Sequence, residues 1–154
     1  MDNCQFHDQG RPKNWPNNPF GDKMKKYPSV LHIIDSLEPG GAEKVAVMMV
    51  NLFSEKGHKA GLMYFVRTPI NLLDMVNNNV QVYPFDRKGK FNILRKQEFQ
   101  KITKEYDLLH VHLKHNLRYV WFMKIFAKIM PSVVFHDHGF SSLNHLDLKV
   151  TKAA

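Results

Sequence analysis

The stretch Val30-Leu31-His32-Ile33-Ile34-Asp35 leads through Ser36 and Leu37 into the turn Glu38-Pro39-Gly40-Gly41. A short apolar run that ends in turn residues is typical of a buried central strand, and the Pro-Gly-Gly segment ends that strand. Apolar residues then recur at three- and four-residue spacing, at Ala42, Val45, Met48, Met49, Leu52 and Phe53. This spacing predicts a helix that runs to about Lys56 and stops at Gly57. The unit is a strand, a glycine turn and a helix.

Strands and helices alternate along the rest of the chain. We expect further strands at residues 60–66, 80–84, 107–112 and 132–136, and helices at 91–104 and 116–130. In the 91–104 helix, the side chains expected to face inward are Ile93, Leu94, Phe99 and Ile102. The 116–130 helix is apolar and basic, which favours a core helix and leaves contact with acidic lipid as the alternative. The alternation predicts an α/β fold, a Rossmann-like parallel sheet flanked by helices.

Composition indicates the domain organisation and the class of partner. Residues 1–27 show neither helical nor strand periodicity, so we expect a disordered or extended arm before one domain at 28–154. The only cysteine is Cys4, and no apolar run reaches the roughly 20 residues that span a bilayer, which favours a cytoplasmic protein. The net charge of +8 favours anionic partners, but the chain shows no nucleic-acid recognition pattern.

The glycine turn is the strongest local indication of a site. Open α/β sheets bind ligands at the carboxyl ends of their strands, where this turn is expected. Gly40 and Gly41 let a ligand approach the backbone, and the N–H groups of the new helix favour a diphosphate. The alternative is that the glycines only form a tight turn. Glu43 falls in the first helical turn, where the helix dipole favours an acid with or without a ligand.

Histidines mark the ends of two predicted strands. His110 and His112 belong to one strand, and His136 and His138 surround the end of the next. Residues two apart on a strand share a face, so each pair points the same way. Imidazoles there suit catalysis or ligand binding, and together with Asp137 they are also competent zinc or iron ligands. A metal site also needs a fixed ligand geometry and hydrogen-bond partners for the ligand residues, and residue spacing establishes neither. We therefore predict no metal site and keep a metal-dependent hydrolase as an alternative.

Several segments together resemble the opening of family 4 glycosyltransferases, which have the GT-B fold. They are residues 30–37 running into 40–45, then 52–58, 106–112 and 133–139, and the resemblance covers about residues 30–140. It implies the N-terminal, acceptor-side domain of a retaining hexosyltransferase in polysaccharide biosynthesis. The implied donor is a nucleoside diphosphate sugar with no further cofactor. The implied acceptor is a glycan or a lipid-linked sugar, with possible peripheral contact at the inner face of a membrane.

The resemblance also implies roles for individual residues. Gly40, Gly41 and Glu43 lie near the donor diphosphate, and His138 is the catalytic histidine that hydrogen-bonds the donor sugar. His112 and His136 are weaker candidates for the acceptor pocket, and His136 replaces a small hydroxyl residue that is frequent in relatives. The second domain of such enzymes has no counterpart after Ala154, so little activity is expected of this chain alone. A non-catalytic fragment that binds a glycan or a partner is the remaining alternative.

Overall fold

The computed structural model describes residues 28–89, 93–127 and 130–138 of the 154-residue chain. The predicted arm at 1–27 lies outside these residues, as do Gly139 and the remainder of the predicted domain to Ala154. Nine elements alternate between strand and helix over most of the described chain.

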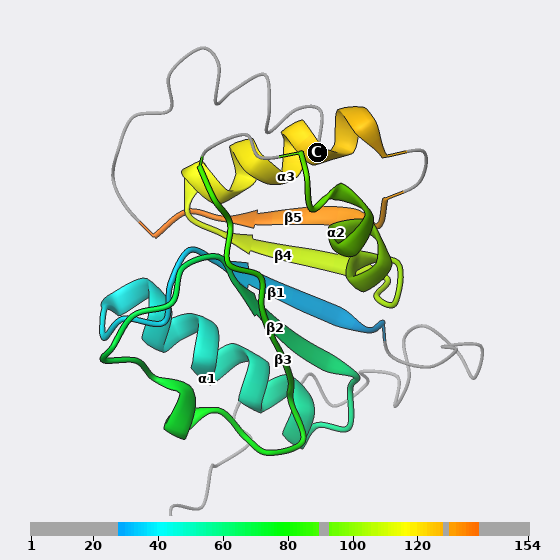
Figure 1. Ribbon diagram of the computed structural model, residues 1–154. Helices are drawn as coiled ribbons and strands as arrows, with labels where there is room; N and C mark the ends of the chain where they lie inside the picture. The colour runs from blue at the N-terminus through cyan, green and yellow to red at the C-terminus, as the bar shows by residue number, and fades with distance from the viewer. Residues whose placement is uncertain (1–27, 90–92, 128–129, 139–154) are drawn as a thin grey trace, which may run out of the picture.

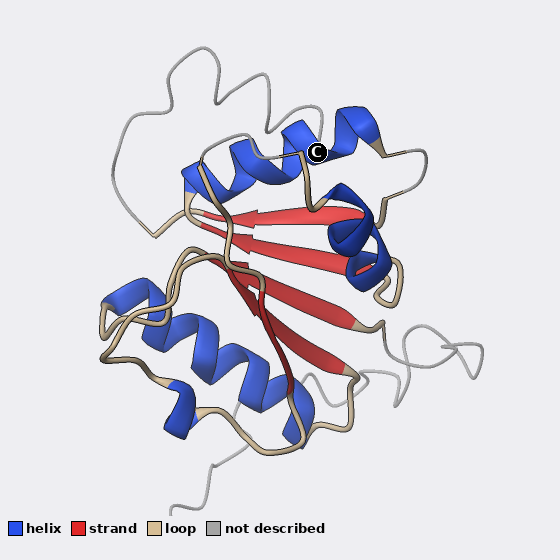
Figure 2. Cartoon of the chain, viewed as in Figure 1, coloured by secondary structure: helices blue, strands red, loops and turns tan. Residues whose placement is uncertain are grey.

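Five parallel strands form one sheet (Figures 1 and 2). They are β1 (Val30–Ile34), β2 (Ala60–Tyr64), β3 (Gln81–Pro84), β4 (Leu108–His112) and β5 (Ser132–His136). The spatial order is β3-β2-β1-β4-β5, so the direction of winding reverses between β1 and β4. The predicted Rossmann-like parallel sheet is therefore confirmed. In such sheets the point of reversal, at the carboxyl ends of the strands, is where ligands bind.

Helices cover both faces of the sheet, as Figure 1 shows. Helix α1 (Gly41–Glu55) packs on one face, with the single turn η1 (Leu73–Met75) near it, and α2 (Lys96–Thr103) and α3 (Lys114–Phe126) pack on the other. Successive side chains of each strand point to opposite faces of the sheet, so the core has two halves, one on each face. Even-numbered side chains of β1 and β2 meet α1, whereas odd-numbered side chains of β1 and β4 meet α2 and α3.

Predictions about helices α1 and α2 need correction. Helix α2 begins at Lys96 rather than near residue 91, and the preceding turn leaves Ile93 and Leu94 exposed, whereas Phe99 is buried and Ile102 packs against the core. Helix α1 has the predicted extent, but its buried residues are Ala46, Val47 and Val50, while Met48 and Leu52 are exposed. Because α1 is apolar on most sides, its spacing does not single out the inward face.

Helix α3 is a core helix, as predicted, but it begins at Lys114 and ends at Phe126 rather than spanning residues 116–130. Its buried residues include Leu117, Tyr119, Val120 and Met123, which pack against the odd-numbered face of the sheet. Within the described residues, no helix combines the length and the apolar character needed to cross a membrane.

A glycine in β2 gives a test of the packing. A Cβ added at Gly61 would overlap the hydroxyl of buried Tyr106 and come within 3.1 Å of Leu31 Cδ1, and Tyr106 is further held by a 3.1 Å hydrogen bond to Tyr83. Gly61→Ala is expected to lower the free energy of unfolding by about 1–3 kcal/mol, because overpacking a core costs that much. The control is Gly41→Ala, where the added Cβ meets nothing within 4 Å. Urea denaturation measures both, and equal midpoints would contradict the prediction.

Candidate functional site

The glycine turn lies at the carboxyl end of β1 and starts α1. The first backbone bond of the helix runs from the N–H of Lys44 to the carbonyl of Gly40, at 3.1 Å. The N–H groups of Gly41, Ala42 and Glu43 precede this bond and so have no acceptor within the helix. No side chain caps this end of α1 among the described residues. The end therefore presents backbone donors and the positive end of the helix dipole.

The two glycines are not needed for backbone conformation. Gly40 is extended, with φ −142° and ψ 176°, and the described glycines with positive φ are Gly57 and Gly89. A Cβ at Gly41 would meet nothing within 4 Å, and one at Gly40 would meet the movable carboxylate of Glu43. The tight-turn interpretation thus loses its conformational basis. What the glycines do provide is an approach to the helix end with no side chain of their own, beside the movable carboxylate of Glu43.

Histidines from three strands gather on the face of the sheet that carries α1. Strand pairing sets His32 of β1 beside His110 of β4, and His112 of β4 beside His136 of β5. His138 follows β5, and its ring stacks on that of His136 with centroids 4.0 Å apart. We call these five residues the histidine array. The prediction that each pair shares a face is confirmed.

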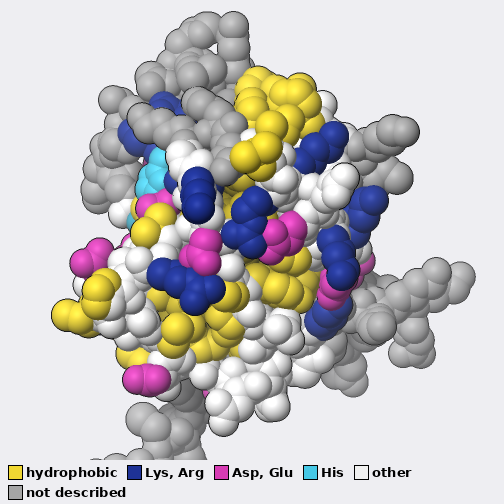
Figure 3. All heavy atoms as spheres, viewed as in Figure 1, with side chains coloured by type: hydrophobic (Ala, Val, Ile, Leu, Met, Phe, Trp, Pro, Cys, Tyr) yellow, Lys and Arg dark blue, Asp and Glu magenta, His cyan; other side chains and the backbone are white. Residues whose placement is uncertain are grey.

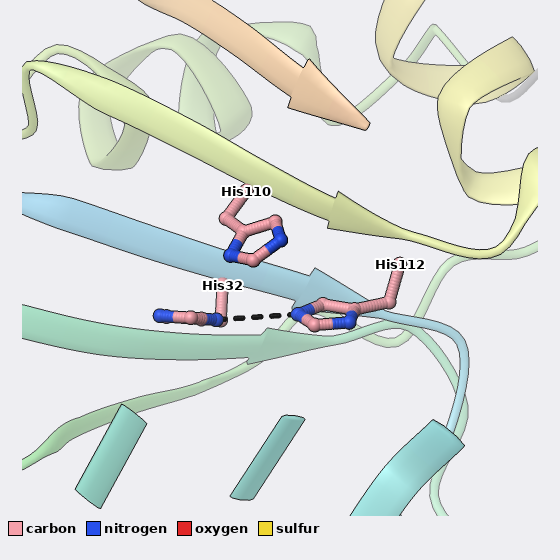
Figure 4. A group of neighbouring side chains, drawn as sticks. All are labelled: His32, His110 and His112. Carbon is pink, nitrogen blue, oxygen red and sulfur yellow. Dashed lines mark hydrogen bonds between the residues drawn. The ribbon is translucent and has the colours of Figure 1, made fainter. Parts of the chain in front are cut away.

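A chain of hydrogen bonds joins three members of the histidine array. His138 Nε2 lies 2.8 Å from His112 Nδ1, and His112 Nε2 lies 3.2 Å from His32 Nδ1 (Figure 4). A neutral imidazole has one donor and one acceptor nitrogen, so the chain runs in a single direction at any moment. It connects the edge of the sheet with its interior, because His138 is partly exposed whereas His32 and His112 are fully buried.

Burial keeps the inner imidazoles neutral. It lowers the pKa of His32 to about 3, that of His110 to about 4 and that of His112 to about 2, and the neighbouring histidines lower each of them further. Burial and then His136 also lower the pKa of His138, whereas Glu43 and Asp137 act to raise it. Charging any of these rings would remove a cation from water and place it near other rings.

The parallel strands also locate the site, because the carboxyl ends of β1, β4 and β5 lie at one edge of the sheet. Glu43, in the first turn of the helix that follows β1, acts to raise the pKa of His138, which follows β5. Gly40, Gly41 and Glu43 therefore share one edge of the sheet with His112, His136 and His138, and all six predicted site residues are brought together. Asp137 is exposed at the same edge.

Charged residues flank this edge at the end of β1. Asp35 accepts a 3.1 Å hydrogen bond from the nearly buried guanidinium of Arg87 and lies 3.5 Å from His115 Nε2. The hydrogen bond from His115, with the charges of His115 and Arg87, lowers the pKa of Asp35 despite partial burial. Arg87 also stacks over the rings of Phe65 and Tyr119, at 4.9 Å from each. The Asp35 carboxylate is thus ionised and fixed in place.

The turn between β4 and α3 fixes the position of His112. Leu113 has φ 69°, a conformation that a bulky side chain rarely adopts, and its N–H donates to the carbonyl of His136 at 3.2 Å. The buried amide of Asn116 donates to the carbonyl of His112 at 2.8 Å. The strained residue Leu113 is therefore next to the candidate site, and these two hydrogen bonds hold the turn in its conformation.

One residue of the site, His32, escaped the sequence interpretation. It lies inside an apolar strand, where a single histidine resembles an ordinary core residue. Two signals were available: His32 is an even-numbered strand residue like His110 and His112, and β1 usually lies beside β4 in a Rossmann-like sheet.

A separate hollow of about 160 Å³ lies near the end of β2. Its lining includes Leu37, Tyr64, Arg67 and Asn71, and none of the predicted site residues lines it.

Acid titration tests the neutrality of the array. Because the folded pKa values of His32, His110 and His112 lie below the ordinary 6.5, the unfolded chain binds more protons below that pH. Stability is therefore full above pH 6.5 and falls as the pH drops toward about 4. Each group contributes up to about 1.4 kcal/mol per pH unit. His110→Gln should reduce the slope by up to that amount, measured by urea denaturation with a chelator present.

The matched control for this titration is Val134→Gln. Val134 is half-exposed on the same face of β5, and its replacement removes no titratable group. The control should keep the wild-type slope. Equal slopes for His110→Gln and the wild type would show that His110 titrates alike in the folded and unfolded chains.

Comparison with known proteins adds no family assignment. No protein-family model matches the chain, and no similar curated protein was found. A function for this chain therefore has to come from the sheet, the start of α1 and the histidine array.

Proposed function

We propose that this chain is the N-terminal, acceptor-side domain of a retaining glycosyltransferase of the GT-B type. It acts with a second, nucleotide-binding domain to move a hexose from a nucleoside diphosphate sugar to a glycan or lipid-linked acceptor. The observation that carries the proposal is the shared position of the uncapped start of α1 and His138, at the edge where the winding of a parallel sheet reverses. The sequence resemblance supports the same assignment.

The start of α1 suits a departing diphosphate. When the bond between the sugar carbon and the phosphate oxygen breaks, negative charge develops on the diphosphate. The N–H groups of Gly41, Ala42 and Glu43 are oriented donors that need no rearrangement to receive this charge. In retention, the acceptor hydroxyl attacks the face that the phosphate leaves, and its proton passes to the departing phosphate oxygen.

His138 supplies a neutral hydrogen-bonding group beside that charge. Its Nε2 is engaged with His112, which leaves Nδ1 to hydrogen-bond a hydroxyl of the donor sugar. His112 is fully buried, so its part is to orient His138 rather than to line an acceptor pocket. His136 is partly exposed and stacked on His138, and it is the member of the pair that can meet an acceptor.

Replacing His138 tests the catalytic role. In an assay with the nucleotide-binding domain present, His138→Ala should lower kcat by about 100- to 1,000-fold, the usual cost of losing one group that stabilises the transition state. The control is His58→Gln, beyond the opposite end of α1. Initial rates of sugar transfer give kcat and KM separately. Near-normal turnover in a folded His138→Ala protein would remove His138 from the mechanism.

Anion binding at the start of α1 is tested on the chain itself. Titration with inorganic pyrophosphate should shift the amide NMR signals of Gly41, Ala42 and Glu43 in wild type. Gly41→Asp should abolish the shifts, because its carboxylate occupies the same positive helix end while the helix remains stable. Gly41→Asn has nearly the same shape without the charge and should keep them. Absence of shifts in wild type at millimolar pyrophosphate, or equal behaviour of the two variants, would contradict the proposal.

A further inference from the structure

We propose that His32, His110 and His112 form a binding site for one zinc ion or a similar divalent transition metal. These three residues, the inner triad, come from the adjacent parallel strands β1 and β4. Each offers one ring nitrogen, and the three nitrogens lie within 4.8 Å of one another. The inner triad shares His112 with the proposed transfer site, but metal binding by the inner triad does not require sugar transfer.

Two nitrogens of the inner triad are spaced as the ligands of an ion with short nitrogen bonds. Zinc binds imidazole nitrogen at about 2.0–2.1 Å, which places two ligands of a tetrahedral ion about 3.3–3.4 Å apart. His32 Nδ1 and His112 Nε2 face each other at 3.2 Å, close to that value. Figure 4 shows the ring of His110 beside the gap between these facing nitrogens. Its ring centroid lies 4.8 Å from that of His32 and 4.5 Å from that of His112.

A packing role alone explains these buried imidazoles poorly. His32 and His112 are fully buried and His110 nearly so, yet His32 Nε2 has no hydrogen-bond partner among the described residues. An unsatisfied buried polar group costs about 1–3 kcal/mol, whereas an apolar side chain there would cost nothing of the kind. The polar rings are therefore better explained by a binding role, in which an ion contacts His32 Nδ1 and His112 Nε2 while His32 Nε2 is not a ligand.

The hydrogen bonds around the inner triad provide the proton arrangement that an ion needs. With the ion in place, His32 Nδ1 and His112 Nε2 both present lone pairs, so the ring protons lie on His32 Nε2 and His112 Nδ1. His112 Nδ1 then donates to His138 Nε2, 2.8 Å away. Such an outer hydrogen bond orients a metal-bound histidine and increases its basicity. Both rings stay neutral throughout, and no proton leaves the protein.

The ligand set selects the class of ion. Three imidazoles suit zinc, copper, nickel or cobalt, whereas magnesium and calcium need oxygen ligands. Three protein ligands leave a fourth position for water. His110 is the member of the inner triad with measurable exposure, and its ring stacks beside that of partly exposed His136 at 5.6 Å.

Metal titration of the untagged chain tests the site. Competition of Zn²⁺ with a chromophoric chelator should give one tight equivalent for wild type, and Co²⁺ should give the intense visible absorption of a tetrahedral complex. His110→Gln should lose both signals. His58→Gln, which removes a histidine outside the histidine array, should keep both. Far-UV circular dichroism confirms that each variant is folded.

A second variant separates the inner triad from its neighbours. His112, His136 and His138 also lie within 4.8 Å of one another and form an outer group at the sheet edge. His136→Gln should retain the tight Zn²⁺ equivalent if the ion occupies the inner triad. Loss of that equivalent in His136→Gln with retention in His110→Gln would overturn the proposal, as would the absence of a tight equivalent in wild type.

The ligating nitrogens can also be identified without any substitution. On addition of Zn²⁺ to wild type, ring ¹⁵N NMR should show metal-induced shifts at His32 Nδ1 and His112 Nε2, with His112 Nδ1 remaining protonated. This measurement keeps the proposal testable even if His110→Gln does not fold. Unchanged ring signals for His32 in the presence of bound Zn²⁺ would place the ion elsewhere.

Discussion

Pairing between β1 and β4 is the constraint on which the rest of the molecule depends. These strands are distant in sequence but adjacent in the centre of the sheet, and their parallel register sets His32 opposite His110. The same pairing makes the winding of the chain reverse at this point, so the loops after β1 and β4 diverge and leave their ends accessible. Without this register, the histidines would be five unrelated side chains, and the start of α1 would face no partner group.

The histidine array shows how parallel strands can concentrate one kind of side chain. Every second residue of a strand points to the same face of the sheet. Residues that are paired on neighbouring strands also point to the same face. Helix α1 covers β1 and β2, whereas half-exposed Val134 on β5 shows that the same face is more open toward that edge. Buried imidazoles at one end of the array and accessible ones at the other therefore follow from the position of a single helix.

The alternation of apolar runs with helical spacing predicted the number of strands and their positions along the chain. It placed β5 at residues 132–136, and it placed the glycine turn, His112 and His136 at the carboxyl ends of their strands. Spacing failed where composition was uniform, since α1 is apolar on most sides and Met48 therefore resembled a buried residue. To predict His32 as a site residue, one must know which strands are neighbours in the sheet. The positive φ of Leu113 cannot be predicted from its residue type.

The single direction of the imidazole chain couples the interior of the sheet to its edge. An ion on His32 and His112 requires His112 Nδ1 to be a donor, so His138 must accept through Nε2 and carry its own proton on Nδ1. That tautomer is the one that can donate to a hydroxyl at the mouth of the site. Thermodynamic reciprocity then demands that an acceptor group bound there strengthens the hold on the ion, and that a donor group weakens it.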